Sequence, residues 1–464
     1  MTDRPRLAFA PAGSPALPLH LVRAEDAPAW LESQPEATRG WLAAQGWAGA
    51  AGDPVLLPAP DGGVAGAVMG LGDAAARARG RFAVARAAAR LPAGVWALAG
   101  TLSPDDRDEA ALGWLLAGYR FDRYRSAKAP AARLLAPAGC DAARLETIAN
   151  AEALTRDLIN TPAADMGPAE LESAFRALGA RYGATVTATV GDDLLAQNLP
   201  MIHAVGRASP RAPRLLDLRW GDAGPAVVLV GKGVCFDTGG LDLKSSANML
   251  LMKKDMGGAA TVMGLAQTIM ESRLPVRLRL LVPAVENAVS GNAMRPRDIL
   301  TSRKGLTVEV NNTDAEGRLI LADALALACE EPADLLVSMA TLTGAARVAL
   351  GPDLAPYYTD HAPLAQALET AAAQVRDPVW RMPFWEPYES QIEPGIADLD
   401  NAPSGGMAGS ITAALFLRRF VSGVPYAHFD IYGHQPADAP ARPKGGVGQG
   451  ARALFAALPA LLGV

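Results

Sequence analysis

The hydrophobic and polar positions of residues 161–464 follow two alternating patterns. Short runs of β-branched and aliphatic residues, such as 226–230, are typical of strands buried in a parallel sheet. Between them, apolar residues recur every three or four positions, which indicates helices with one buried face. This alternation predicts an α/β/α fold with a central, mostly parallel (mixed) sheet. The expected strands are 185–190, 226–230, 277–282, 307–310 and 334–339, and the expected helices are 168–182, 259–272 and 319–329.

The amino-terminal part repeats these patterns on a smaller scale. Strands are expected at 65–71 and 94–99, and helices at 74–91 and 109–119. The Ala- and Pro-rich stretch 129–140 indicates a linker, and 141–159 a helix with Asp141 as its N-cap. We therefore expect a small α/β domain over 1–138, a linker and connecting helix over 139–160, and a larger catalytic domain over 161–464.

Composition narrows the classes of function. The chain has 464 residues, of which 50% are hydrophobic and 20% charged, as in globular proteins. A net charge of −5 offers no basic field for a nucleic-acid partner. Three scattered cysteines form no disulfide framework or zinc finger. We see no signal peptide and no membrane-spanning run, so a cytoplasmic protein without a membrane partner is expected.

A glycine-rich polar segment follows the strand 226–230. A phosphate-binding P-loop would need Ser or Thr after Lys232, but Gly233 stands there. A dinucleotide fingerprint would need a third glycine where the chain has Phe236. Both kinds of nucleotide site are therefore excluded. The charged residues left to explain are Lys232, Asp237, Lys244 and Asp255.

A second polar segment, residues 311–318, joins the strand 307–310 to the helix 319–329. Turns between a strand's carboxyl end and a helix's amino end are where α/β folds bind ligands, because unpaired helix N–H groups favour anions. Asp314 and Glu316, two residues apart, can point the same way. A pair of loop acids is usually solvated. Residues 311–318 therefore indicate a functional site only when they are considered together with the glycine-rich segment that follows 226–230.

Together the two segments resemble the signatures of the leucine aminopeptidase (cytosol aminopeptidase) family of two-metal exopeptidases. The matching stretches are GKGVCFDTGGLDLK from Gly231, KKDMGGAA from Lys253 and NNTDAEGRLILADAL from Asn311, with further matches at 341–344, 405–409 and 427–430. NTDAEGRL is highly specific to that family. The resemblance covers roughly 150–460. It implies a metal-dependent aminopeptidase that hydrolyses the N-terminal peptide bond of short peptides and prefers Leu or other apolar first residues. Family members are homohexamers whose N-terminal domain does no chemistry.

The resemblance assigns roles position by position. Two divalent metal ions, manganese or zinc with magnesium as a further candidate, would share a water acidified to hydroxide. Lys244 would polarise the scissile carbonyl, and Arg318 would anchor a bicarbonate ion as general base. The implied metal ligands are Lys232, Asp237, Asp255, Asp314 and Glu316. The implied contacts to the first residue of the substrate are Met252, Ala315, Thr341, Leu342 and Gly344.

Charge balance explains why metals are needed. Four converging carboxylates would carry a formal −4, which two dications cancel. Without metals, the three cationic side chains would leave −1, a structural salt-bridge network that is costly to bury unless fully paired. Lys232 can bind a metal only as a neutral amine, and neutralising a lysine at pH 7 costs about 4.6 kcal/mol. A dication at bonding distance can offset that free-energy cost.

Some positions depart from the family pattern without touching a predicted ligand. Ala345 stands where the family has a cysteine, Arg297 where it has a glycine, and Ser245 where it has a proline. We expect these three differences to affect the shape of the pocket and the rigidity of its loops. The resemblance assigns no role to Asp242 and Lys253, or to His428 and His434, for which packing or assembly is expected. Two rival functions stay open: a catalytically idle scaffold and a two-metal hydrolase of phosphoesters.

Overall fold

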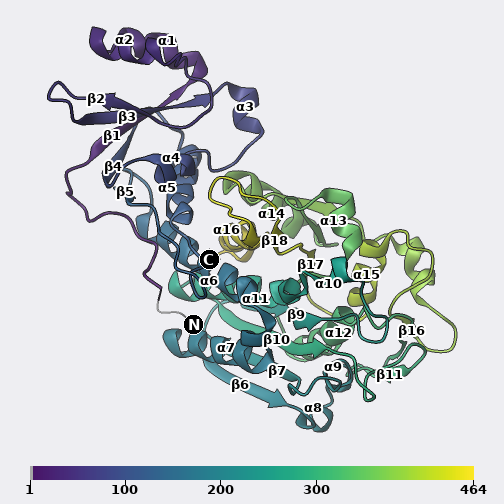
Figure 1. Cartoon of the computed structure of the whole chain (residues 1–464). Coiled ribbons are helices and arrows are strands. Elements are labelled where there is room, and N and C mark those ends of the chain that lie inside the picture. Colours follow the sequence, from purple (N-terminus) through teal and green to yellow (C-terminus); the bar gives the residue numbers. More distant parts are fainter. Residues whose placement is uncertain (1–3) are drawn as a thin grey trace. The chain divides into compact units, whose positions relative to one another are not determined.

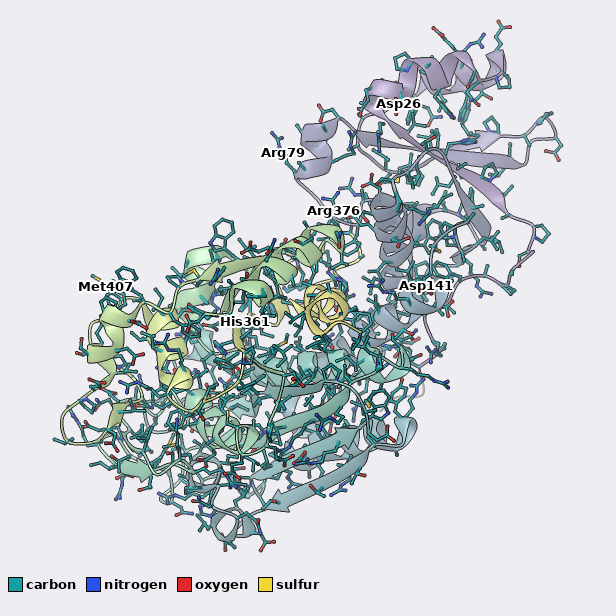
Figure 2. The ribbon with its side chains drawn as sticks, turned by 180° about the vertical axis from the view of Figure 1, so that it is seen from behind. Asp26, Arg79, Asp141, His361, Arg376 and Met407 are labelled. Carbon is teal, nitrogen blue, oxygen red and sulfur yellow. The ribbon has the colours of Figure 1, made fainter. Side chains whose placement is uncertain are left out.

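The computed structural model describes residues 4–464 and contains two compact units (Figure 1). The first unit extends to Ala153 and includes Ala437–Lys444, and the second comprises Leu154–Pro436 and Gly445–Val464. The boundary falls within helix α6 (Ala142–Asn160). Asp141, labelled in Figure 2, accepts a hydrogen bond from the backbone N–H of Arg144 at 3.0 Å, which confirms it as the N-cap.

The first unit is an α/β domain in which the predicted strands 65–71 and 94–99 are confirmed. Its sheet has the order β2-β3-β1-β4-β5, parallel except for the β2–β3 pair. The strands are β1 (Leu17–Arg23), β2 (Val55–Pro58), β3 (Val64–Gly72), β4 (Gly94–Ala99) and β5 (Ala132–Leu134). The helices are η1 (Ala24–Asp26), α1 (Ala27–Glu32), α2 (Glu36–Ala44), α3 (Ala74–Ala78), α4 (Ala85–Arg90) and α5 (Pro104–Ala117).

Three predictions in this unit are wrong in detail. The helix expected over 74–91 is divided into α3 and α4, because Phe82 takes a left-handed backbone (φ 58°) and is buried. Its N–H donates to the Glu109 carboxylate at 2.6 Å, so packing overrides the helix propensity of the alanines. The next helix begins earlier than predicted, since Ser103 caps it ahead of Pro104. The expected linker 129–140 contains β5.

The second unit is built on a mixed sheet whose central strands are parallel, as predicted. Its order is β15-β14-β17-β13-β8-β10-β7-β6, with β9 also paired to β10. The pairs β17–β13, β13–β8 and β8–β10 are parallel, and antiparallel pairs occur toward both edges. The strands are β6 (Thr185–Val190), β7 (Arg214–Trp220), β8 (Ala226–Gly231), β9 (Gly233–Asp237), β10 (Arg277–Asn287), β13 (Leu335–Ala340), β14 (Ala355–Tyr358), β15 (Val379–Met382) and β17 (Tyr426–Asp430).

Helices cover both faces of this sheet (Figure 1). One face carries α7 (Pro168–Tyr182), α11 (Gly257–Glu271), α14 (Ala362–Gln374) and α16 (Ala451–Leu462), and the other carries α9 (Pro200–Gly206), α12 (Gly317–Ala328) and α15 (Gly409–Arg418). The remaining elements are α8 (Asp193–Ala196), α10 (Ser246–Met249), α13 (Gly344–Leu350), the 3-10 helices η2 (Ala163–Asp165), η3 (Met252–Met256) and η4 (Glu386–Ile392), and the small sheets of β11 (Ile299–Thr301), β12 (Thr307–Glu309) and β16 (Leu399–Asp400) and of β18 (His434–Gln435) and β19 (Gly445–Gly446). Among residues 4–464, none of the helices has the length and apolar character needed to cross a bilayer.

His428 lies in the core of this unit on β17. Its Nδ1 is 2.8 Å from the Ser338 hydroxyl, and its ring stacks on Tyr358 with centroids 6.1 Å apart. Burial, with a further contribution from Arg318, lowers the pKa of His428 to about 3. The packing expected for this histidine is therefore what the structure shows.

The buried His428 predicts a pH dependence of stability. Between pH 6.5 and about 3 the unfolded chain binds a proton at this residue that the folded chain does not, so stability rises with pH across this window. The effect of this one residue is on the order of 1 kcal/mol per pH unit. In urea unfolding followed by tryptophan fluorescence, His428→Gln should be less stable at pH 7 but should lose stability less steeply from pH 6.5 to 4.5. Parallel pH profiles for variant and wild type would contradict the assignment.

Candidate active site

The charged residues of the two polar segments meet at the carboxyl end of the parallel strands. Lys232 stands between β8 and β9, Asp237 ends β9, and Asp255 lies in η3. Glu316 directly precedes α12. Asp237, Asp255 and Glu316 are all buried, and each offers an oxygen within 4.8 Å of the others. Residues 79 positions apart along the chain are thereby brought into one cluster by the strand order.

Lys232 is the central cation of this cluster. Its Nζ lies 2.8 Å from Asp255 Oδ2 and 2.9 Å from Glu316 Oε1, and it donates to the Thr341 carbonyl at 3.1 Å. Only 3% of the residue is exposed. Gly317 explains how it fits, because a Cβ at that position would lie 2.5 Å from Lys232 Cε. A side chain at 317 would push the lysine away from the acids.

Lys244 forms a second cationic contact at the cluster. Its Nζ is 2.9 Å from Asp237 Oδ2 and also pairs with Asp314. The loop that carries it turns at Gly239 (φ 90°), where a Cβ would lie 2.5 Å from the carbonyl oxygen of Asp242. The other Asp237 oxygen accepts hydrogen bonds from Gly239 N–H at 2.8 Å and from Asn287 Nδ2 at 2.9 Å.

Side chains to which the resemblance assigned no role hold the two loops together. Asn287 also donates to the Thr313 carbonyl, at 3.0 Å. Asp242 accepts from Thr313 N–H at 2.7 Å, which gives this acid a structural task. Asn401 accepts from the N–H groups of residues 311 and 312 and donates to the carbonyls of residues 312 and 315. The role of Asn401 could not be predicted from a local sequence pattern, because its hydrogen-bond partners lie about ninety positions away.

The electrostatics of the cluster reflect crowded carboxylates in a dry site. Burial and the neighbouring Asp237 raise the pKa of Glu316 to about 8 and that of Asp314 to about 6. Burial alone would lower the pKa of Lys232, but Asp255 and Glu316 outweigh it and raise that pKa. Lys244 behaves likewise next to Asp237. The two lysine ammonium groups therefore stand where the carboxylates require positive charge.

These residues fit divalent metal ions. Asp255 Oδ2 and Glu316 Oε1 lie against the Lys232 ammonium, and Asp314 Oδ1 pairs with Lys244. Among residues 4–464, lysine ammonium groups are thus the partners of these three buried carboxylate oxygens. Buried charged oxygens need such a partner or a cation. Carboxylate oxygens with one lysine amine are a hard-to-borderline donor set, which suits magnesium, manganese or zinc.

Arg318 lies in the first turn of α12, beside the cluster. It is 7% exposed, and its Nη1 donates to the Asn401 carbonyl at 2.5 Å. Its Nε is buried and has no hydrogen-bond partner within the described chain. Burial lowers the pKa of Arg318 to about 10, so it stays cationic at neutral pH. An unpaired guanidinium N–H beside a cavity is a site for an anion.

A cavity of about 440 Å³ opens next to the charged residues. It is lined by Lys232, Asp237, Lys244, Asp255, Asp314 and Arg318. The residues that the resemblance assigned to the substrate, Met252, Ala315, Thr341, Leu342 and Gly344, line the same cavity. Residues of both sets that the resemblance assigned, the charged residues and the substrate contacts, thus lie around one cavity.

Asp430 holds the Thr341–Gly344 side of the cavity. It is buried at the end of β17 and accepts from the N–H groups of Leu342 at 3.1 Å and Thr343 at 3.0 Å. Ser410 donates to it at 2.8 Å. Burial raises its pKa. The motif 427–430 contains this acid, but a carboxylate that binds backbone N–H groups cannot be told from a ligand by sequence alone.

Comparison with known proteins identifies the family. Residues 153–455 match the catalytic domain of the cytosol aminopeptidase family, and residues 17–137 match the M17 aminopeptidase N-terminal domain. The chain belongs to the cytosol aminopeptidase family. It is therefore a metal-dependent hydrolase of the leucyl aminopeptidase type, which confirms both the resemblance and the predicted two-domain α/β fold.

Individual cytosol aminopeptidases are similar over most of their length. A probable cytosol aminopeptidase of Roseiflexus castenholzii is 40% identical over 75% of each chain, and one of Rhodococcus jostii is 38% identical over 88% of this chain and 85% of the relative. The crystal structure of the Coxiella burnetii cytosol aminopeptidase has 42% identity and a TM-score of 0.93 over 98% of this chain and 99% of that one. The bottromycin maturation enzyme BotP in complex with Mn has 32% identity and a TM-score of 0.86, over 96% and 99%.

The cluster predicts that Glu316→Ala removes metal and activity together. The change deletes one buried carboxylate and a counter-ion of Lys232, so we expect fewer bound metal ions in elemental analysis and a loss of aminopeptidase turnover of at least about 1,000-fold. Glu330→Ala, just beyond the other end of α12, is the matched control and should retain both. Near-normal turnover of a folded Glu316→Ala protein would refute the role of this residue.

Proposed function

We propose that this aminopeptidase releases the first residue of short peptides with two divalent cations, and that it prefers Leu or other apolar first residues. The observation that carries the proposal is the group of buried acids within 4.8 Å beside a cavity that Lys244 and Arg318 also line. A site of this kind binds a cationic group and offers positive charge to a developing oxyanion.

The metal ions would be held by Lys232, Asp237, Asp255, Asp314 and Glu316. Manganese, zinc or magnesium bound there would supply an acidified water as the nucleophile. Binding requires Lys232 as a free amine, so the proton that this side chain carries between Asp255 and Glu316 must leave. BotP, with its bound Mn, supports manganese as one of the candidates.

Lys244 and Arg318 would act on the substrate from the cavity wall. The Lys244 ammonium lies 2.9 Å from Asp237 and would polarise the scissile carbonyl, then stabilise the oxyanion. Arg318 keeps Nε free of protein partners, and we propose that it orients a bicarbonate ion as the general base. A planar fork of N–H donors matches a planar carbonate.

The first residue of the peptide would lie against Met252, Ala315, Thr341 and Gly344, with Leu342 offering backbone contacts. Met252 and Ala315 provide an apolar surface, which supports a preference for Leu or Met. Asp430 would keep Leu342 in place through its backbone N–H, so that the neighbouring carbonyls face the cavity in a fixed direction.

Metal-dependent peptide hydrolysis is the first property to measure. Purified protein with added manganese or zinc should hydrolyse leucine p-nitroanilide and should lose this activity after chelation. p-Nitrophenyl phosphate should not be hydrolysed under the same conditions. Absence of metal-dependent anilide turnover in folded protein would favour an idle scaffold, and turnover of the phosphate alone would favour a phosphoesterase.

We also propose that the protein is a cytoplasmic homohexamer. The names of the curated relatives support the location. The resemblance to the cytosol aminopeptidase family, to which the chain belongs, is the basis for the proposed assembly.

Light scattering coupled to size exclusion tests the assembly. Six chains of 48.1 kDa predict a particle of about 290 kDa. The mass should persist on dilution to low micromolar protein, as expected for a large apolar interface. A species of one chain across that concentration range would overturn the hexamer and leave the chemistry of the single site untouched.

A further inference from the structure

One wall of the cavity carries two cations that the proposed mechanism does not use. Lys254 and Arg347 both lie against the ring of Tyr432, with Lys254 Nζ 5.2 Å and the Arg347 guanidinium carbon 5.1 Å from its centroid. All three residues line the cavity. Two cations on one aromatic ring are attracted to its electron-rich face but repel each other, so the arrangement concentrates positive charge.

This charge has no acidic partner within the described part of the chain. No carboxylate lies at ion-pair distance from Lys254 or Arg347 between residues 4 and 464. Asp255, the next residue after Lys254, has its oxygens engaged by Lys232 and by the Thr341 hydroxyl. Lys254 is only 7% exposed, so water cannot fully replace a counter-ion. Buried cations without a partner are costly, and in a binding cavity they mark a place for an anion.

The two cations continue the surface assigned to the first residue of the substrate. Lys254 follows Met252 by two positions in η3, and Arg347 lies one helical turn after Gly344 in α13. Tyr432 precedes Gly433, where a Cβ would lie 3.0 Å from the Thr341 methyl. The apolar residues and the cations therefore belong to the same segments of chain. Together they form one pocket that has an apolar part and a positively charged part.

We propose that the pocket for the first residue accepts an acidic side chain, glutamate above all, in addition to apolar ones. The methylenes of glutamate would pack on Met252, and its carboxylate would bind Lys254 and Arg347. This inference rests on the proposed aminopeptidase function. The planar guanidinium fork of Arg347 can bind both oxygens of a carboxylate.

Glutamine is the informative comparison, because it has the shape of glutamate without the charge. A charge-assisted hydrogen bond is about twice as strong as a neutral one, so we expect kcat/KM for glutamate p-nitroanilide to exceed that for glutamine p-nitroanilide by about 10- to 100-fold with Mn²⁺. Leucine p-nitroanilide reports the basal reaction. These anilides carry no terminal carboxylate, so the side chain is the one possible anion.

Substitutions connect the preference to the two cations. Lys254→Met and Arg347→Gln should each lower the glutamate-to-glutamine ratio by at least about fivefold, and the double variant should bring it close to one. Lys253→Met is the matched control: it removes the same charge one residue earlier, where the side chain donates to the Asn160 carbonyl and does not line the cavity. Its ratio should equal that of the wild type.

The results separate this inference from the function on which it rests. Leucine turnover with a glutamate-to-glutamine ratio near one, or a ratio insensitive to Lys254→Met and Arg347→Gln, would overturn the acidic pocket alone. Loss of turnover on all anilides in folded, metal-loaded wild type would overturn both. A second arm compares Leu-Gly with Leu-glycinamide: if the two substitutions abolish a preference for the free carboxylate there and leave the anilide ratio unchanged, the cations bind the peptide's C-terminus, and the side-chain assignment is wrong.

Discussion

Like-charged carboxylates buried at close range are the constraint on which this structure depends. Asp237, Asp255 and Glu316 lie within 4.8 Å of one another and are almost inaccessible to water. Such a group is unstable unless positive charge enters it. The Lys232 ammonium supplies part of that charge, but one ammonium carries +1 against three carboxylates. A bound cation would relieve this electrostatic imbalance.

The sheet makes this imbalance tolerable by placing each acid on a rigid element. Asp237 ends β9, Asp255 lies in the 3-10 helix that leads into α11, and Glu316 directly precedes α12. Uncharged amides then connect the loops, with Asn287 joining Asp237 to the Thr313 carbonyl. Because these contacts are satisfied in the protein itself, the carboxylates are held ready for cations rather than being gathered by them.

The cavity beside the cluster combines surfaces of different character. Met252 and Ala315 are apolar, whereas Lys254 and Arg347 stand without acidic partners against Tyr432. An enzyme that used only the apolar surface would gain nothing from burying Lys254, since a buried cation costs free energy. The family relationship establishes the reaction. The choice of substrate depends on cavity side chains such as these, because apolar and cationic side chains bind different groups of a substrate.

What the sequence determined by itself was the type of most elements and the identity of the charged residues. The period of apolar positions predicted β3, β4, β6, β8, α7 and α12 within a few residues, because packing and local preference agree there. It failed at Phe82, where burial of one aromatic ring breaks an alanine-rich helix. Only the tertiary structure decided which charges are paired: it brought Asn401 and Asp430 to loops about ninety positions away, and it left Lys254 and Arg347 without acids. Pairing depends on distances across the strand order, and these are not encoded in any local stretch of sequence.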